Sequence, residues 1–265
     1  MKIRILFLVF VTCISSYLRS EVLELQHFRE IDAHITPETL IVLDIDDTLL
    51  IPSQMLGCDE WFRYRIEKYS KAGMNASSAL EKSLAEWESV RHITRMEIVE
   101  PQTDAIVRAL QEQGYSIMGL TTQGLALATL TVQQLRANNI DLLHTAPCKD
   151  DHYFMLSGHG VLLRQGILFA SGKHKGEVLF TMLDKIGLSP KRIAFINDKA
   201  AHLYEMEKTA LERNVSFVGL RYAYSDARKA AFRPEIAELQ FSQSTFTHLL
   251  SDEEALSLME EDQSS

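Results

Sequence analysis

The stretch LIVLDIDDT, residues 40–48, decides the fold class of this chain. Its first four residues form an unbroken apolar run, which is typical of a strand buried on both faces, as in a parallel sheet. Similar runs recur at residues 116–120, 192–196 and 215–220, and a weaker one lies at residues 140–143. We expect each run to be a strand of the same sheet.

Helical patterns separate these runs, at residues 101–114, 175–186 and 200–213. Pro101 begins the first and Gly187 follows the second, as is typical of helix starts and ends. Strands that alternate with helices of this size predict an α/β fold with a parallel sheet and helices on both of its faces.

Residues 51–98 interrupt this alternation. They show no strand pattern but two helical ones, the first at residues 59–71 and the second opening at the capping-box sequence of residues 78–81. The second pattern places Leu80, Leu84 and Trp87 on one face, and both tryptophans of the chain lie in this insert. We expect a small helical cap that is inserted directly after the first strand.

The remaining segments complete the expected domain organisation. Residues 152–169 contain short apolar stretches around glycines, which predicts a β-hairpin insertion. Residues 21–50 and 99–250 are expected to form the core, with residues 21–39 as a leader that precedes the first strand. Residues 251–265 are an acidic tail, expected to be a solvated end.

Residues 1–20 are typical of a signal peptide. Lys2 and Arg4 precede an apolar run of ten at residues 5–14, which is too short for a permanent membrane span, and cleavage is expected after Ser20. We therefore expect a periplasmic or secreted protein with no permanent membrane span after the signal is removed. An uncleaved anchor or a buried first strand is the alternative.

Composition excludes several classes of protein. The chain has 265 residues, 46% of them apolar and 24% charged, which indicates a globular rather than a disordered protein. Its net charge of −9 argues against a protein that binds nucleic acid by neutralising phosphates. After signal removal, Cys58 and Cys148 remain, either as one bridge or as two unpaired thiols. No CxxC spacing indicates a structural zinc site.

Charged and hydroxylated residues follow the predicted strands, where ligands bind in an open α/β sheet. They are Asp44 and Asp46 after the first run, Thr121 and Thr122 after the second, Asn197 and Asp198 after a later one, and a lysine-rich turn at residues 172–176. Asp44 and Asp46 are two residues apart and project to the same side. Their mutual repulsion favours a bound cation, and oxygen ligands of this kind suit Mg²⁺, with Asp198 as a further ligand.

These four motifs, in this order, resemble the haloacid dehalogenase-like (HAD) superfamily over roughly residues 40–222. They are DxDxT after a first strand, Thr after a second, Lys at the start of a helix and an acid after a later strand. The sequences DIDDTL and KGEVL also resemble a poorly characterised, exported bacterial branch of that superfamily. The resemblance implies a Rossmann-like HAD core with the cap inserted after its first strand.

The resemblance also implies a role for each motif residue. Asp44 would be the nucleophile that takes the phosphoryl group, and Asp46 would protonate the leaving oxygen and then deprotonate the hydrolytic water. Thr121 would hydrogen-bond a phosphoryl oxygen, and Lys175 would hold and screen the Asp44–phosphate pair. The Asp44 carboxylate, the Asp46 carbonyl and Asp198 would bind Mg²⁺.

Several alternatives stay open at this point. Thr122 competes with Thr121 and Lys173 with Lys175, and Asn197 stands where the superfamily often has a second acid. Asp47 is expected to cap the loop or face solvent, with a role near the metal as the alternative, and Thr48 is expected to orient that loop. Two other sets of residues are expected to be structural rather than functional. They are the cap aromatics Trp61, Phe62, Tyr64 and Tyr69, and the histidines His152, His159 and His174 of the hairpin and its exit.

The sequence therefore predicts an exported, Mg²⁺-dependent phosphatase that hydrolyses a small phosphorylated substrate through an aspartyl-phosphate. A phosphotransferase or mutase of the same superfamily is one alternative. A catalytically weak secreted binding or effector protein is the other. No nucleic-acid partner is expected, and the oligomeric state is left open.

Overall fold

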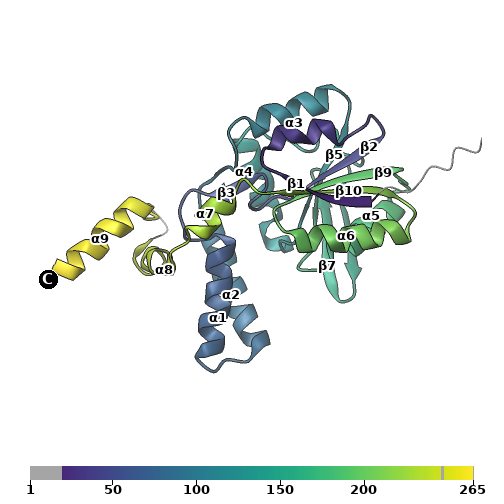
Figure 1. The fold of residues 1–265 in the computed structure, drawn as a ribbon. Coiled ribbons are helices and arrows are strands. Elements are labelled where there is room, and N and C mark those ends of the chain that lie inside the picture. Colours follow the sequence, from purple (N-terminus) through teal and green to yellow (C-terminus); the bar gives the residue numbers. More distant parts are fainter. Residues whose placement is uncertain (1–19, 246–247, 265) are drawn as a thin grey trace, which may run out of the picture.

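The structure is a computed structural model that describes residues 20–245 and 248–264. Within them, eight strands form one sheet in the order β1-β10-β9-β2-β5-β8-β7-β6 (Figure 1). The strands are β1 (Ser20–Leu25), β2 (Thr39–Leu43), β5 (Ser116–Thr121), β6 (His152–Leu156), β7 (His159–Arg164), β8 (Ile167–Phe169), β9 (Arg192–Asn197) and β10 (Ser216–Tyr222). All neighbours from β1 to β8 are parallel, and β7 and β6 extend the sheet as an antiparallel hairpin. The predicted α/β fold and the hairpin are confirmed.

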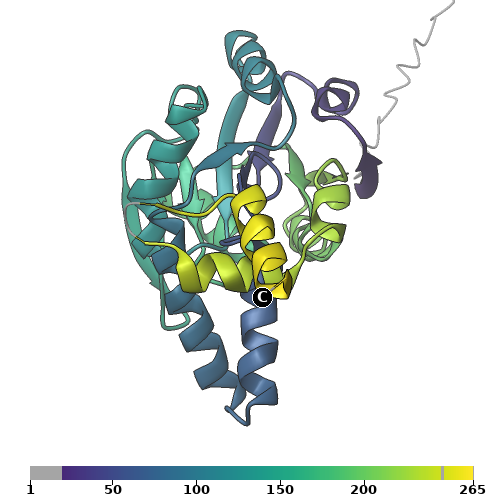
Figure 2. The same cartoon turned by 90° about the vertical axis from the view of Figure 1, so that its left-hand side faces the viewer.

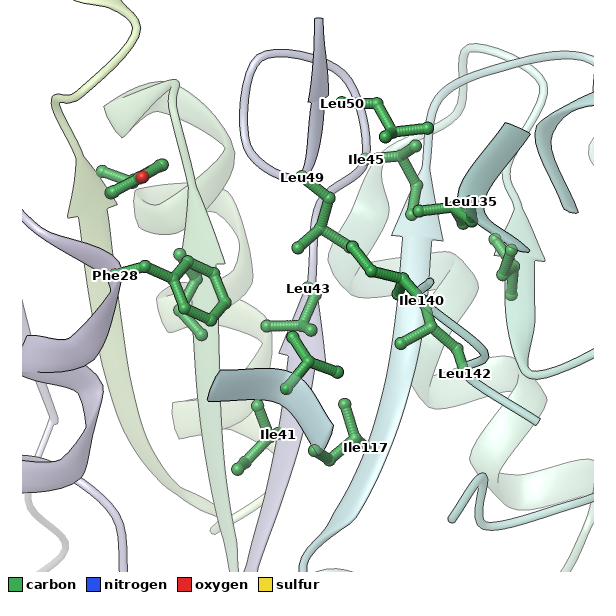
Figure 3. Close-up of a cluster of buried hydrophobic side chains, with 14 of the residues drawn as sticks. Phe28, Ile41, Leu43, Ile45, Leu49, Leu50, Ile117, Leu135, Ile140 and Leu142 are labelled. Carbon is green, nitrogen blue, oxygen red and sulfur yellow. The ribbon is translucent and has the colours of Figure 1, made fainter. Parts of the chain in front are cut away.

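The sheet is covered by helices on both faces because its central strand is apolar on both. Ile41 and Leu43 of β2 face a core under α3 and α4, whereas Leu40 and Val42 face a second core under α5 and α6. Figure 3 shows the first of these cores. Burial of each such side chain stabilises the fold by about 1.5–3 kcal/mol. The helices are α3 (Thr103–Glu112), α4 (Ala128–Ala137), α5 (Lys175–Lys185) and α6 (Ala200–Glu212), with short 3₁₀ helices η1 (Phe28–Ala33) and η2 (Leu125–Leu127).

The segment between β2 and β5 contains the helical pair expected from the sequence. Helices α1 (Asp59–Lys71) and α2 (Ala76–Arg91) project from the edge of the sheet (Figure 1). The side chain of Asn75 accepts a hydrogen bond from the backbone of Ser78 and so starts α2 earlier than the predicted capping box. The expectation of no strand here is wrong. Strands β3 (Leu50–Pro52) and β4 (Met96–Ile98) pair antiparallel at the base of the helices, and three residues each are too few to give a pattern.

Two other expectations about strands are wrong. The supposed leader contains β1, a half-exposed edge strand beside β10, where glutamates interrupt the apolar residues and hide the pattern. Residues 140–143 form no strand, because β8 occupies the place beside β5. Ile140 and Leu142 are nevertheless buried in the core, which explains their apolar character.

The acidic C-terminus is folded rather than a free end. It follows α7 (Asp226–Ala230) and α8 (Pro234–Gln243) and forms α9 (Asp252–Ser264), which lies beside α8 (Figure 2). Asp252 accepts hydrogen bonds from the Met55 backbone (3.0 Å) and the Gln240 side chain (2.8 Å), and Ala255 is fully buried. These contacts correct the expectation of a solvated tail, whereas the domain boundaries themselves stay a prediction.

The predicted signal peptide lies outside the described residues, except for Ser20 at the start of β1. None of the helices in the described part of the chain has the length and apolar character that a membrane span requires. The two cysteines are free thiols, which settles the open question of their pairing. Cys58 caps α1 by accepting the Trp61 backbone N–H (3.3 Å), and Cys148 contacts His152 (3.3 Å).

Candidate active site

The predicted site residues meet at the carboxyl ends of β2, β5 and β9. Asp44 follows β2, Thr121 ends β5 and Asp198 follows β9, while Lys175 begins α5. In a parallel sheet these strand ends lie at one edge, where the connections leave a crevice for a ligand. The fold therefore brings together residues that are up to 154 positions apart in the sequence.

A buried ion pair joins Asp44 and Lys175. The Lys175 Nζ lies 2.6 Å from the Asp44 Oδ1, and the side chains are 1% and 8% exposed. The backbone N–H of Ile45 donates to the same oxygen (2.9 Å). Burial raises the pKa of Asp44 to about 6, Lys175 opposes this, and the charge of Asp198 adds to it. Burial likewise lowers the pKa of Lys175. Lys173, by contrast, is half-buried on the turn before α5.

Asp198 is a buried carboxylate with one satisfied and one unsatisfied oxygen. Its Oδ2 lies 3.0 Å from the Lys229 Nζ of α7, while its Oδ1 is buried without a hydrogen-bond partner. Its backbone N–H donates to Thr48 (3.2 Å), which ties the β9 loop to the loop after β2. Asp198 lies close enough to Asp44 for its charge to raise the pKa of Asp44. A buried carboxylate oxygen without a partner, beside a second carboxylate, fits a bound cation.

More carboxylates lie at this edge of the sheet than the sequence indicated. Carboxylate oxygens of Asp47, Asp59 and Glu60 all lie within 4.8 Å of one another. Among the described residues, this is the one cluster of His, Cys, Asp or Glu side chains whose possible metal ligands lie so close together. Asp47 is buried, with burial and the charge of Asp198 raising its pKa, so the expectation of a solvated residue is wrong. Lys199 lies 3.0 Å from Asp59 and offsets part of this charge.

Asp46 is held from two sides. Its Oδ1 accepts from Arg91 at the end of α2, and its Oδ2 accepts from Gln123 in the loop after β5, both at 2.8 Å. Thr131 donates to the Gln123 side chain (2.6 Å) and fixes its orientation. Gln123 directly follows the two threonines of the second motif and Arg91 belongs to no motif, but only the fold identifies them as neighbours of Asp46.

The other predicted residues divide between the site and its supports. Thr121 is buried and accepts from the Gln123 backbone (3.1 Å), whereas Thr122 is exposed, and both line the cavity at this edge. Asn197 accepts from the Lys199 backbone (2.8 Å) and so shapes the loop that carries Asp198. His174 caps α5 through Glu177 (3.4 Å), a structural role.

A cavity of about 490 Å³ opens over these residues. Its floor contains Asp44, Asp46 and the two threonines, and its wall on the cap side contains Phe62 and Trp87. The lining also contains His159, which the sequence analysis named, and His202, which it did not. Burial, together with Lys175 and Lys199, lowers the pKa of His202 to about 3, so it is neutral.

The other cap aromatics have structural contacts. Trp61 is buried and donates to Glu238 of α8 (3.0 Å), and Tyr69 bonds to Arg65 and Glu86. The Tyr64 ring lies near the Lys68 ammonium, 5.9 Å from its centroid. Of the four aromatics considered from the sequence, Phe62 is thus the one among the residues that line the cavity.

A family model described as "Protein of unknown function (DUF2608)" matches residues 24–256. Two proteins of Chlamydia pneumoniae, each described as "Putative outer membrane protein", are 24% identical to this chain. One alignment covers 91% of this chain and 92% of the relative, and the other covers 98% of both. A protein of Chlamydia trachomatis with the same description is 21% identical over 76% of this chain and 75% of its own length.

Among solved structures, a haloacid dehalogenase-like hydrolase of Streptococcus pneumoniae is similar, with a TM-score of 0.43 and 16% identity. The alignment covers 70% of this chain and 95% of that one. A phosphoserine phosphatase with a phospho-aspartyl intermediate analogue gives a TM-score of 0.36 and 15% identity, over 70% and 94% of the two chains.

Proposed function

The chain belongs to the DUF2608 family, and we propose that it is a Mg²⁺-dependent phosphatase that hydrolyses phosphate monoesters through an aspartyl-phosphate at Asp44. The observation that carries this proposal is the buried Asp44–Lys175 pair beside Asp198 at the meeting point of three parallel strands. A nucleophilic carboxylate beside a fixed ammonium is the arrangement that the transfer of a phosphoryl dianion requires. The order of the four motifs supports the same chemistry.

The cation site has the donors that Mg²⁺ prefers. The Asp44 carboxylate, the Asp46 carbonyl and the unpartnered Asp198 Oδ1 would hold it, all of them hard oxygen ligands. When bound, Mg²⁺ would neutralise charge on the phosphoryl oxygens. Lys175 would screen the phosphoryl group from the other side.

Each step can be assigned to residues of this chain. Lys175 and the Ile45 N–H both bind Oδ1 of Asp44, which leaves Oδ2 to attack phosphorus as the ester P–O bond breaks. Asp46, once its contact with Arg91 opens and it takes a proton from solvent, would give that proton to the leaving oxygen. Water then attacks phosphorus, Asp46 takes the proton, and the Asp44–phosphorus bond breaks. The hydroxyl oxygen of Thr121 already accepts a hydrogen bond from the Gln123 backbone. Its hydroxyl proton would therefore be donated to a phosphoryl oxygen.

A panel of phosphate esters, with Mg²⁺ and with chelator, tests this proposal. Wild type should hydrolyse at least one ester only with Mg²⁺, and beryllium fluoride, which mimics a phosphoryl group on a carboxylate, should inhibit it. Asp44→Asn should abolish turnover, and because it leaves Lys175 without its buried partner, thermal unfolding checks that the variant is folded at the assay temperature. Asp32→Asn is the matched control, because Asp32 is exposed and remote from the motif residues. Equal activity of wild type and Asp44→Asn would refute the mechanism.

One observation favours a second function, a secreted binding protein without turnover. Arg91 and Lys229 already neutralise Asp46 and Asp198, so this edge of the sheet has fixed cations of its own. Binding of phosphate by wild type, with no hydrolysis of any ester in the panel, would support that reading over the phosphatase.

We also propose that the protein is exported to the periplasm or beyond. The charged start and the ten-residue apolar run support this, as does the description of the relatives as outer membrane proteins. N-terminal sequencing of natively expressed protein should find Glu21 first. Retention of Met1 would contradict the proposal.

A further inference from the structure

The cap presents an apolar stripe to the cavity. Leu80, Leu84, Trp87 and Arg91 follow one another at helical spacing along α2, and all four line the cavity. The sequence pattern alone suggests that the two leucines are buried, yet Leu80 is 47% and Leu84 is 39% exposed. Phe62 of α1 lies beside Trp87, with 5.8 Å between the ring centroids, and extends the stripe.

The stripe ends at the floor of the cavity, where Asp44 and Asp46 lie. Arg91, its last residue, binds Asp46 (2.8 Å), and the guanidinium lies 4.9 Å from the Trp87 ring centroid. An occupant whose phosphoryl group lies against Asp44 on the cavity floor would therefore have the stripe beside the rest of the molecule. The cavity volume of about 490 Å³ is within the usual range for small-ligand sites, about 300–1,000 Å³, and leaves room for an organic group.

The chemistry of the stripe restricts that group. Leu80, Leu84 and Phe62 offer no hydrogen-bond donor or acceptor on their side chains. A polyhydroxylated group against them would lose water without gaining partners, which is costly, whereas an apolar group would be favoured. We propose that the substrate is a phosphate monoester of an apolar alcohol, and that Leu80 and Leu84 are the specificity residues. This inference rests on the proposed phosphatase function.

Binding of alkylphosphonates tests the inference independently of turnover, because their P–C bond is not hydrolysed. In the presence of Mg²⁺, Kd for the methyl, butyl, hexyl and octyl compounds should fall by about two- to fourfold per added methylene, as partial to full burial predicts. A 3-hydroxypropyl compound should bind more weakly than the butyl compound of similar length. Equal Kd values along the series would overturn the inference.

Two variants assign the effect to the stripe. The double variant Leu80→Ser, Leu84→Ser should flatten the dependence on chain length while Kd for methylphosphonate stays within about twofold. Leu211→Ser is the matched control, because Leu211 is 46% exposed on α6 and is not among the cavity residues. A control variant with the same flattening, or a double variant with none, would also overturn the proposal.

The outcomes separate the two proposals. Flat binding with Asp44-dependent hydrolysis would remove the specificity inference and leave the phosphatase. If no phosphonate binds and no ester is hydrolysed, both fail. Vesicles that contain phosphatidic acid, compared with monomeric octyl phosphate, distinguish a membrane lipid from a soluble ester as the source of the apolar group.

Discussion

At the scale of single residues, the site consists of charges that need one another. Asp44 and Lys175 are both buried, and either one alone would be an uncompensated charge in the interior. Asp46 differs, because Arg91 and Gln123 fix it at the cavity with its side chain 26% exposed. This difference in exposure supports the proposed roles, with Asp44 as the nucleophile and the more accessible Asp46 as the acid–base residue.

The role of Asp46 predicts a dependence on the leaving group. Asp46→Asn should slow hydrolysis of alkyl phosphates by about 10²–10⁴, the usual contribution of a general acid. The leaving group of nitrophenyl phosphate needs no proton, so with this ester Asp46→Asn should slow the formation of the phosphoenzyme less. Rapid-quench measurements should find phosphate accumulating on Asp44 in this variant. Equal slowing of both esters in the first step would contradict the role.

The raised pKa of Asp44 predicts how Mg²⁺ binding depends on pH. Its pKa of about 6 exceeds the ordinary value of 3.8, so the folded metal-free protein binds this proton more tightly than the unfolded chain. Stability from this group is therefore present at low pH and is lost as pH rises through about 6. Mg²⁺ competes with the same proton, so half-saturating Mg²⁺ should rise by roughly tenfold per unit below pH 6. The same half-saturating Mg²⁺ concentration at pH 7 and at pH 5 would contradict this prediction.

At the scale of elements, the cap joins the core where α1 begins and where α2 ends, and it also contacts the C-terminal helices. Glu238 of α8 accepts from Trp61 of α1 (3.0 Å) and from Arg65 (2.9 Å). Leu56, Trp61 and Ala237 are buried in one cluster between these elements. The position of α1, and with it the cavity wall, therefore depends on residues that follow the core strands in sequence.

Removal of the Glu238 carboxylate should loosen this contact. Glu238→Ala should lower the free energy of unfolding by about 2 kcal/mol, since charged hydrogen bonds contribute about 1.5–3 kcal/mol each and Glu86 still holds Arg65. Glu235→Ala is the control on the same helix. Its ion pair with Arg233 is half exposed, so the change should stay below about 0.5 kcal/mol. Urea denaturation measures both, and equal losses would contradict the role of Glu238.

At the scale of the whole molecule, the two ends of the chain complete the fold. The N-terminal strand β1 pairs with β10, the last strand, and Leu25 is buried beneath it. The C-terminal helix α9 contacts the cap through Asp252. One edge of the sheet and the cap wall thus depend on contacts with segments that follow Asp198, the last motif residue, in the sequence.

Truncation tests where the folded protein begins. A chain of residues 21–265 should fold with unchanged stability, because Ser20 is the one β1 residue that it lacks. In a chain of residues 26–265, the free energy of unfolding should fall by at least about 2 kcal/mol, because the buried Leu25 is missing and the edge of β10 is exposed. Thermal unfolding compares them. Equal midpoints for the two chains would show that β1 contributes nothing.

The sequence by itself determined the fold class, the order of the motifs and the helical insert, because these follow from local patterns. Apolar runs of four to six residues identify buried strands, and the acids and hydroxyls that follow them indicate the edge of the sheet where the candidate site lies. The pattern failed where strands were short or half exposed, as in β1, β3 and β4.

Only the tertiary structure decided which residues meet. The sequence favoured Lys175 over Lys173 because it stands at the predicted helix start, and in the structure the start of α5 brings Lys175 to Asp44. Arg91 and Lys229 belong to no motif, yet each neutralises a carboxylate of the site. Such pairs depend on the geometry of helices that are remote in sequence, and no local pattern encodes that geometry. The exposure of Leu80 and Leu84 is likewise set by the cavity that α2 faces and not by their spacing.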